Sequence, residues 1–449
     1  MANVIRIKKG LDIRLAGEAP KVDLTATMGD TFAVTPDAFH GLQPRLMVKA
    51  GDRVMAGSPV IHDKVNPDVL LTAPVSGEVT NVVRGAKRRI LAVEIKVDQN
   101  IDYKEFDVSG VTSMGREEIL ALLLKSGFFA LFRQRPYDIV PNPNVTPRNI
   151  FVTGYLSAPL MPKAGDLVES DKQHLQKAVD ALRKLTDGRV VMGFKKGEAI
   201  NLDGADIYEI EGNHPAGNAG VLANHTYPVN KGETVWTLAL PELALIGRFL
   251  ATGKVDMRRK IVLAGSRLST PGYVNVISGA DIASIINDKL DSKPEHRRVI
   301  DGDVLTGALV TDEHKYLSPL SNIITVIPEG DDKVELFGWA SLGLNKFSMS
   351  HSFPSFMTGS RKYDLDARLN GGKRAIIQSG EYEKVFPMDI YPEQLIKAII
   401  AFDIDRMEEL GIYEVAPEDF AVCEFIDTSK LELQYIVRKG LDLLYKEMN

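Results

Sequence analysis

The sequence predicts a multidomain protein that combines α/β and α+β architecture, with four regions in succession. Three observations lead to this prediction. Residues 4–97 consist of short β-rich segments separated by glycine and proline. Between residues 150 and 265, apolar strand patterns alternate with helical patterns, and two long helical patterns dominate the chain after Trp339. Because 449 residues exceed what one ordinary core needs, we expect two to four domains.

Residues 1–105 are predicted to form an all-β domain. VKAGDRVMAGSPV (48–60) and APVSGEV (73–79) place turn-forming Gly-Asp, Ala-Gly and Ser-Gly pairs between alternating β-branched residues. This pattern resembles the biotinyl and lipoyl carrier domains, whose fold is the barrel-sandwich hybrid. Such domains attach their prosthetic group to a lysine at a hairpin tip, and Lys64 is the only lysine available here. It lies a few residues early and precedes Val65-Asn66-Pro67, so we expect a carrier-like fold without a prosthetic group.

Residues 106–265 are predicted to form an α/β domain. A first helix is expected with Ser113 as its N-cap and Gly127 at its end. The strand patterns IFVTG, RVVMG, ADIYEIEG and KIVLAG then alternate with the helical patterns KQHLQKAVDALRKL and PELALIGRFLATG, in which Pro241 suits the first turn. Alternation of this kind favours a largely parallel sheet.

The remainder of the chain divides into two predicted regions. Residues 266–335 combine short strands with one helical pattern, GADIASIINDKLDS, and are predicted to form a small mixed α+β module. Residues 336–449 contain the long periodic segments PEQLIKAIIAFDIDRMEELG and TSKLELQYIVRKGLDLLYKEM, which predict a helical C-terminal domain.

Composition excludes several classes of function. The net charge is −6, with 54 basic and 60 acidic residues well mixed, so nucleic acid is not an expected partner. The N-terminus has no apolar core typical of a secretory signal, and the most apolar stretch, Ile119 to Phe132, is shorter than the roughly 20 residues of a membrane span. The single cysteine, Cys423, excludes internal disulfides and any zinc or iron–sulfur site built from several thiolates of this chain.

One glycine-containing stretch, EGNHPAGNAGVLANH, raises the question of phosphate or metal binding. Its glycines, Gly212, Gly217 and Gly220, do not have the G-x-G-x-x-G spacing of a dinucleotide site. His214 and His225 lack compact spacing and an obvious third ligand, so we assign them no chemistry.

Three segments resemble the A subunit of the bacterial sodium-translocating NADH:quinone oxidoreductases: IRIKKGLDIRLAGEAP, TAPVSGEVTNVVRGAKRRILAV and EGNHPAGNAGVLANHTYPVNKGETVWT. The resemblance covers essentially the whole chain. It implies a Rossmann-like fold for residues 106–265, a β-grasp, SLBB-like fold for residues 266–335, and a ferredoxin-type helical domain without clusters for residues 336–449. The family is related to the C subunit of the Rnf complex and to the flavin subunit of respiratory complex I.

Those relatives carry a flavin loop, G-G-A-G-F-P, where this chain has Phe132 to Tyr137, FRQRPY. The larger side chains are expected to fill the space of FMN or NADH, although the two arginines leave anion binding open. The Rnf relatives also bind two iron–sulfur clusters through C-x-x-C-x-x-x-C-P motifs. By spacing, the ligand positions correspond to residues that cannot hold a cluster: Ser379, Tyr382 and Phe386 before Pro387, and then Phe420, Cys423 and Asp427.

The resemblance therefore implies a chain without a redox cofactor and without catalytic or metal-binding residues of its own. FMN, FAD, riboflavin and iron–sulfur centres are expected in partner subunits. The complex oxidises NADH, reduces a quinone such as ubiquinone in the respiratory chain, and exports sodium ions. This chain is expected to be peripheral, on the cytoplasmic side of the bacterial inner membrane, docked on the membrane-embedded B subunit.

A second hypothesis makes the chain a quinone-binding module, with a site between the α/β and β domains. The aromatic residues Phe128, Phe129, Phe132 and Tyr137 motivate it, because a quinone headgroup needs apolar walls and a few hydrogen bonds. Core packing is the favoured alternative for these aromatics. A third hypothesis, an independent flavin or biotin enzyme, is disfavoured by the missing loop glycines, cysteines and carrier lysine.

Overall fold

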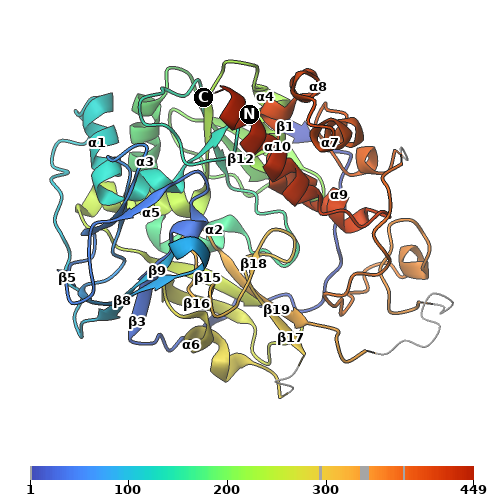
Figure 1. Cartoon of the computed structure of the whole chain (residues 1–449), viewed down its shortest axis with the longest axis horizontal. Coiled ribbons are helices and arrows are strands. Elements are labelled where there is room, and N and C mark those ends of the chain that lie inside the picture. The colour runs from blue at the N-terminus through green and yellow to red at the C-terminus, as the bar shows by residue number, and fades with distance from the viewer. Residues whose placement is uncertain (1–2, 293–295, 334–342, 378–379, 449) are drawn as a thin grey trace.

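The computed structural model describes residues 3–292, 296–333, 343–377 and 380–448. A six-stranded sheet forms its upper part in Figure 1. The sheet has the order β1 (Asn3–Arg6), β13 (Asp206–Glu211), β12 (Val190–Lys195), β11 (Ile150–Thr153), β14 (Val235–Ala239) and β10 (Arg133–Arg135). All neighbouring strands are parallel except β10, which runs antiparallel to β14.

The two faces of this sheet pack against different layers, because successive side chains of a strand point to opposite faces. Ile150 and Val152 belong to the core shared with α1 (Arg116–Ser126), α3 (Lys172–Leu185) and α5 (Leu240–Thr252). Phe151 and Val191 belong to a second core, shared with α4 (Ala219–Thr226) and the C-terminal helices. The sheet is thus buried on both faces, as expected for parallel strands.

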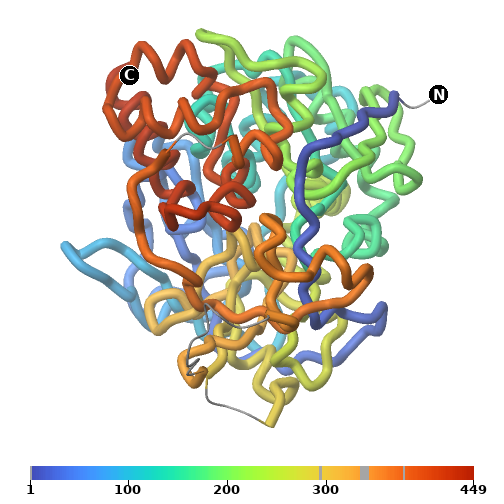
Figure 2. The backbone as a smooth tube through the Cα atoms, turned by 90° about the vertical axis from the view of Figure 1, so that its right-hand side faces the viewer, coloured from blue at the N-terminus to red at the C-terminus, as the bar shows by residue number. Residues whose placement is uncertain are grey.

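The N-terminal β strands form two small antiparallel sheets that pack on each other. One sheet consists of β3 (Thr31–Val34), β9 (Ile90–Val97), β8 (Gly77–Arg84) and β5 (Arg53–Val54), and the other of β4 (Pro44–Leu46), β6 (Pro59–Asp63) and β7 (Leu70–Thr72). The β8–β9 hairpin protrudes to the left of the molecule in Figure 2.

A fourth sheet lies below the parallel sheet in Figure 1. Its order is β18 (Ala308–Leu309), β17 (Arg297–Asp301), β19 (Ile323–Pro328), β15 (Arg258–Ala264), β16 (Gly272–Ile277) and β2 (Asp23–Leu24), with α6 (Ile282–Ile286) following β16. The side chain of Asp281 caps α6 by accepting a hydrogen bond from the Ala283 amide at 2.8 Å.

The C-terminal region contains α7 (Pro392–Ile400), α8 (Ile404–Glu409), α9 (Ala421–Ile426) and α10 (Leu433–Met448), coloured red in Figure 1. The short helix α2 (Ala164–Leu167) follows β11. The described residues also form short 3-10 helices: η1 (Pro36–Ala38), η2 (Ala86–Arg88), η3 (Phe128–Leu131), η4 (Glu169–Asp171), η5 (Asn287–Lys289), η7 (Pro354–Met357), η8 (Tyr382–Lys384), η9 (Ile412–Glu414) and η10 (Pro417–Phe420).

Strand pairing differs from the sequence prediction at two places. β1 and β2 lie in the predicted all-β region, but they pair with β13 and β16 of the other two sheets. The sequence pattern places β15 in the parallel sheet, but this strand pairs with β16 and β19. The short connection between β15 and β16 explains the second difference, because sequential strands joined by a short loop tend to pair antiparallel. The predicted domain boundaries at residues 105, 265 and 335 remain predictions, and Glu335 and Leu336 lie outside the described residues.

The first helix also begins later than predicted. Gly115, and not Ser113, is the N-cap of α1, and the Glu118 carboxylate accepts the Gly115 amide at 2.8 Å. Ser113 instead donates its hydroxyl to the Gly110 carbonyl. The end of this helix is as predicted: Gly127 has φ of 84°, a left-handed conformation that glycine adopts without a steric penalty. Within the described part of the chain, no helix is long and apolar enough to cross a membrane.

Candidate functional site

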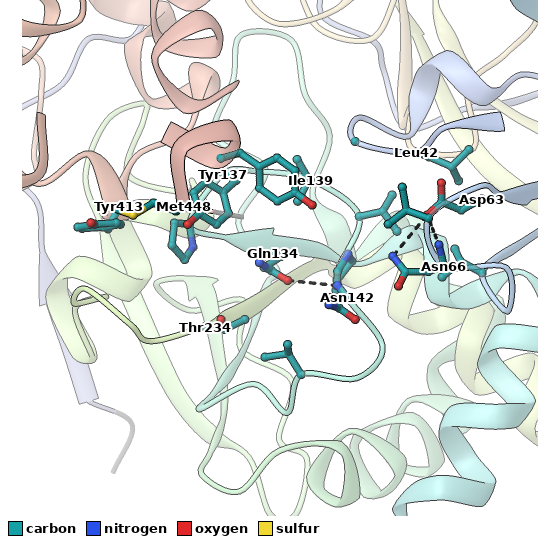
Figure 3. Close-up of a pocket in the computed structure, with 18 of the residues that line it drawn as sticks. Leu42, Asp63, Asn66, Gln134, Tyr137, Ile139, Asn142, Thr234, Tyr413 and Met448 are labelled. Carbon is teal, nitrogen blue, oxygen red and sulfur yellow. Dashed lines mark hydrogen bonds between the residues drawn. The ribbon is translucent and has the colours of Figure 1, made fainter. Parts of the chain in front are cut away.

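A cavity of about 380 Å³ lies where four distant segments of the chain meet. These segments are the β6–β7 hairpin tip with residues 41–43, the connection 134–145, the loop 231–234, and the C-terminal residues 413–448. Figure 3 shows Asp63 and Asn66 on one side of the cavity, Gln134 and Asn142 in its middle, and Tyr413 and Met448 on the other side. The volume falls within the roughly 300–1,000 Å³ of small-molecule sites.

The first wall is the hairpin tip that carries Lys64. Buried Asp63 fixes this tip, because its carboxylate accepts the amides of Gln43 at 2.8 Å and Asn66 at 2.9 Å. Lys64 is exposed, whereas Val65 and Asn66 line the cavity. The tip therefore contributes a rigid wall to the cavity.

The second wall is the connection that follows β10. Its turn is closed by two backbone hydrogen bonds, from the Gln134 amide to the Ile139 carbonyl and from the Asp138 amide to the Gln134 carbonyl. The Gln134 side chain accepts the Asn142 amide at 3.2 Å, as the dashed line in Figure 3 shows. These bonds present the side chains of Tyr137 and Ile139 to the cavity.

The third wall comes from the C-terminal region. The rings of Tyr137 and Tyr445 meet edge to face, with centroids 5.1 Å apart. Arg438 of α10 donates to the carbonyls of Tyr137 and Asp138 and forms an ion pair with Asp442 at 3.0 Å. α10 is thereby attached to the turn after β10.

The charged residues at the rim are paired with one another. Lys231 contacts the Glu408 carboxylate at 2.8 Å, and Glu233 contacts Arg148 at 2.6 Å. Burial favours the neutral acid of Glu233, but hydrogen bonds from Asn230 and Arg148 lower its pKa. Burial and the hydrogen bond to Glu408 raise the pKa of Tyr413, so this phenol stays neutral at physiological pH. The cavity can therefore bind a ligand by apolar contact and hydrogen bonds.

Of the four predicted quinone-contacting aromatics, only Tyr137 lines this cavity. Phe129 and Phe132 are fully buried and pack on Trp236, with ring centroids 5.3 and 5.5 Å away. Phe128 packs on Phe249 at 5.1 Å and lines a smaller void of about 50 Å³ beneath β3 and β7. The structure therefore places Phe129 and Phe132 in the hydrophobic core.

The two arginines of the stretch 132–137 have acceptors within the chain. Arg135 is fully buried, and its guanidinium donates to the Asp419 carboxylate at 2.8 Å, to Glu418 at 3.0 Å and to the Glu414 carbonyl at 2.7 Å. Burial alone lowers the pKa of Arg135, but the carboxylates of Asp419 and Glu418 outweigh it and raise this pKa. Arg133 donates to the carbonyls of Ala38 and Ala130.

Tight packing accounts for the glycines of the stretch 211–225. A Cβ atom on Gly220 would lie 2.7 Å from both Arg135 Nη1 and Asp419 Oδ2, and a Cβ on Gly217 would lie 2.0 Å from the Tyr155 carbonyl oxygen. His214 is buried and shares a hydrogen bond of 2.9 Å between its Nδ1 and the Ser157 hydroxyl. Burial lowers the pKa of His214. The glycines of this stretch therefore allow α4 to pack closely against Arg135 and Asp419.

Five of the six positions matched to cluster ligands lie together in the C-terminal core, and Ser379 lies outside the described residues. The rings of Phe386 and Phe420 are 4.9 Å apart, and Cys423 Sγ lies 4.0 Å from the Tyr382 carbonyl oxygen. Burial raises the pKa of the Cys423 thiol. Asp427 accepts the amides of Ser429 and Leu431 at 3.0 and 2.7 Å. Among the residues that the structure describes, no group of three or more His, Cys, Asp or Glu side chains could hold a metal ion.

Sequence reasoning missed most of the cavity. Asn142, Arg438 and Tyr445 lie far apart in the sequence, and only the packing of α10 on the turn after β10 brings them together. The proline-rich composition of the connection, PYDIVPNPNVTPRN, was the one local signal, because long irregular connections frequently carry functional residues.

Comparison with known protein families matches three parts of the chain to family models. Residues 5–98 match the family described as NqrA N-terminal barrel-sandwich hybrid domain, residues 114–255 match the NqrA second alpha/beta domain, and residues 261–312 match the NQRA C-terminal domain. The fold and the matched domains thus define a multidomain protein of the NqrA class.

Curated relatives that are named as the A subunit of a Na(+)-translocating NADH-quinone reductase match almost the whole chain. The protein from Rhodopirellula baltica is 37% identical over 99% of this chain and 99% of its own length. Those from Vibrio vulnificus and Neisseria meningitidis serogroup A are 33% and 32% identical, each over 99% of this chain and all of their own length. The chain belongs to the NqrA family, the A subunits of the Na(+)-translocating NADH-quinone reductases.

Among solved structures, an NAD+-reducing [NiFe]-hydrogenase in the air-oxidized state aligns with 51% of this chain and 52% of its own chain. The TM-score is 0.31 and the identity is 11%, which is too low to support a conclusion.

Proposed function

We propose that this chain is a subunit of a sodium-translocating NADH:quinone oxidoreductase that carries no redox centre and supports the assembly of the complex. The names of its relatives assign them to such a reductase. The observation that carries the proposal is the packing at the positions matched to cofactor-binding residues. Arg135, at a position matched to the flavin loop, is buried against Asp419, and Phe386, Phe420 and Cys423, at positions matched to cluster ligands, are buried. In this proposal, quinone reduction and sodium export depend on FMN, FAD, riboflavin and iron–sulfur centres of other subunits.

The proposal extends to the finer fold assignments and to the place of the chain in the cell. We interpret the parallel sheet as a Rossmann-like domain, the sheet β15–β19 as a β-grasp, SLBB-like module, and α7–α10 as a ferredoxin-type scaffold without clusters. The chain would dock on the membrane-embedded B subunit at the cytoplasmic side of the bacterial inner membrane. The helices α7 and α10 pack against each other, which supports the interpretation of a helical scaffold.

The absorption spectrum and metal content of the purified full-length chain test the first part of this proposal. We expect a colourless protein with less than stoichiometric iron and no flavin released on denaturation, because buried side chains fill the corresponding space. A stoichiometric flavin or iron–sulfur centre that copurifies with the chain would contradict the proposal.

The cavity favours a second function, a contribution to the quinone site. Its walls combine apolar side chains such as Ile139 and Val140 with the hydrogen-bonding groups of Asn142 and Tyr137. A quinone headgroup needs this combination. Phe129, one of the four aromatics that motivate the quinone hypothesis, is unsuitable for a test by substitution because it lies in the core, where truncation to alanine typically costs about 3–5 kcal/mol.

Calorimetric titration of the full chain with a short-chain quinone tests this second function. We expect one-to-one binding that is at least tenfold weaker in Tyr137→Ala, because this ring faces the cavity. Tyr391→Ala is the matched control, since Tyr391 is 66% exposed and does not line the cavity. Equal affinity of the wild type and Tyr137→Ala, or no saturable binding, would exclude the cavity as a quinone site.

A further inference from the structure

The segment 343–377 combines exposed apolar side chains with an excess of positive charge. Five of the nineteen strongly exposed large apolar side chains among the described residues lie within it: Leu344, Phe356, Met357, Leu369 and Ile377. Exposed apolar side chains that are concentrated in one segment commonly mark a contact with another molecule or with a membrane. Met357 and Ile377 are the most exposed of the five, at 75% and 71%.

The charge of this segment is opposite to that of the whole chain. It contains six basic and two acidic residues, whereas the chain has 54 basic and 60 acidic residues. Both aspartates are already engaged with neighbours: Asp366 with Lys333 and Arg368, and Asp364 with Arg267. The basic side chains that remain at the surface are Arg361, Lys362, Lys373 and Arg374.

Two of these four basic side chains have acidic partners outside the segment. Lys362 lies 3.4 Å from the Glu18 carboxylate, and Lys373 lies 2.6 Å from the Glu432 carboxylate. All four of these side chains are more than half exposed, and ion pairs between exposed groups contribute little free energy. Both lysines can therefore exchange these partners for an anionic group at the surface.

The segment is held in place by backbone contacts with an N-terminal arm, residues 14–16, and with the connection between α9 and α10. Tyr363 pairs through its backbone with the arm, because its amide donates to the Arg14 carbonyl at 2.8 Å and its carbonyl accepts the Ala16 amide at 2.8 Å. The Arg374 amide donates to the Ser429 carbonyl at 2.8 Å. The segment lies across the front of the molecule in Figure 2, where it is coloured orange. Its exposed side chains are therefore carried by a backbone that is anchored to the rest of the chain.

We propose that the segment 343–377 is a lipid-contacting surface, which binds the anionic head groups of a bilayer through its basic residues and inserts its exposed apolar side chains at the interface. Lysine and arginine interleaved with aromatic and aliphatic residues is the arrangement that binds peripheral proteins to anionic membranes. The inference goes beyond the proposed function, since it makes lipid a direct ligand of this chain.

Cosedimentation of the full-length chain with vesicles tests this proposal. We expect binding to vesicles that contain phosphatidylglycerol, weak binding to vesicles of phosphatidylcholine alone, and a decline with added salt. Lys373→Gln with Arg374→Gln should weaken partitioning onto the anionic vesicles roughly 30-fold, because each basic residue near such a surface contributes about 1 kcal/mol. Met357→Ser with Ile377→Ser should weaken it as well, and neither pair removes a buried side chain.

The control is the double variant Lys87→Gln, Arg88→Gln at the tip of the β8–β9 hairpin. It removes the same charge from another exposed basic site, which protrudes at the edge of the molecule in Figure 2. We expect this control to bind within twofold of the wild type. Equal binding of the wild type to vesicles with and without anionic lipid would overturn the proposal. Equal losses of binding in the control and in the Lys373/Arg374 variant would overturn it as well. Because the vesicles contain no other subunit, that failure would leave the proposed function untouched.

Discussion

At the residue scale, the buried Arg135–Asp419 ion pair connects three parts of the chain. Arg135 ends β10, Asp419 lies in η10, and Asn218 at the start of α4 donates to the same carboxylate at 3.1 Å. Removal of one partner from a buried ion pair is destabilising, because it leaves an uncompensated charge in a medium of low polarity.

Asp419→Ala should therefore lower the free energy of unfolding by about 3–5 kcal/mol. Urea denaturation followed by circular dichroism measures this change. Glu418→Gln serves as the control, because the Glu418 side chain is 45% exposed, and we expect less than about 1 kcal/mol there. A loss below about 1 kcal/mol for Asp419→Ala would show that the pair does not hold these segments together.

The burial of His214 predicts that the free energy of unfolding depends on pH. Burial lowers the pKa of His214 in the folded state. At pH values between that lowered pKa and about 6.5, the unfolded chain therefore binds more protons at this residue than the folded chain does. The free energy of unfolding should fall as the pH is lowered below about 6.5, and the His214 contribution should be constant above that value. Urea titrations at several pH values should show a shallower acid slope in His214→Gln than in the wild type. Parallel slopes would contradict the burial of a neutral His214.

At the element scale, the attachment of α10 to the turn after β10 closes the cavity. Arg438 reaches the carbonyls of Tyr137 and Asp138, and Asp442 also contacts His40 at 3.0 Å. Two elements that lie about 300 residues apart in sequence are thus joined by one side chain.

Arg438→Ala should release α10 from this turn and cost about 1.5–3 kcal/mol, the usual value for hydrogen bonds to a charged group. Hydrogen exchange of the amides in residues 433–448 reports the release directly, and we expect faster exchange there. Lys439→Ala is the matched control, because Lys439 contacts the ring of exposed Tyr435 on the same helix. Equal exchange in both variants would show that Arg438 does not hold the helix.

The elements also show where prediction from sequence succeeds. Gly127 ends α1 and Pro241 lies in the first turn of α5, as predicted, because both effects act within a few residues. The partners of β1 and β2 could not be predicted, since β1 pairs with a strand some 200 residues away and no local pattern encodes that register. The cavity could not be predicted for the same reason, because it forms between segments that lie far apart in the sequence. Tyr137 in its wall was nevertheless among the predicted aromatics.

At the scale of the whole molecule, the chain combines domains that match the NqrA family with buried side chains, among them Arg135, Phe386 and Phe420, at positions matched to cofactor-binding residues. The parallel sheet is covered on one face by α3 and α5 and on the other by the C-terminal region, so the domains share two continuous cores. In the role proposed for it, the chain contributes through its surfaces and its cavity. Its removal should therefore affect the complex as an assembly.

The most direct test of this account is sodium uptake by inverted membrane vesicles from cells that lack this chain, measured together with NADH-driven quinone reduction. We predict that the remaining subunits fail to assemble, that sodium-coupled quinone reduction is lost, and that the full-length chain restores both when it is supplied again. Intact assembly and undiminished sodium-coupled quinone reduction without the chain would contradict its supporting role in the complex.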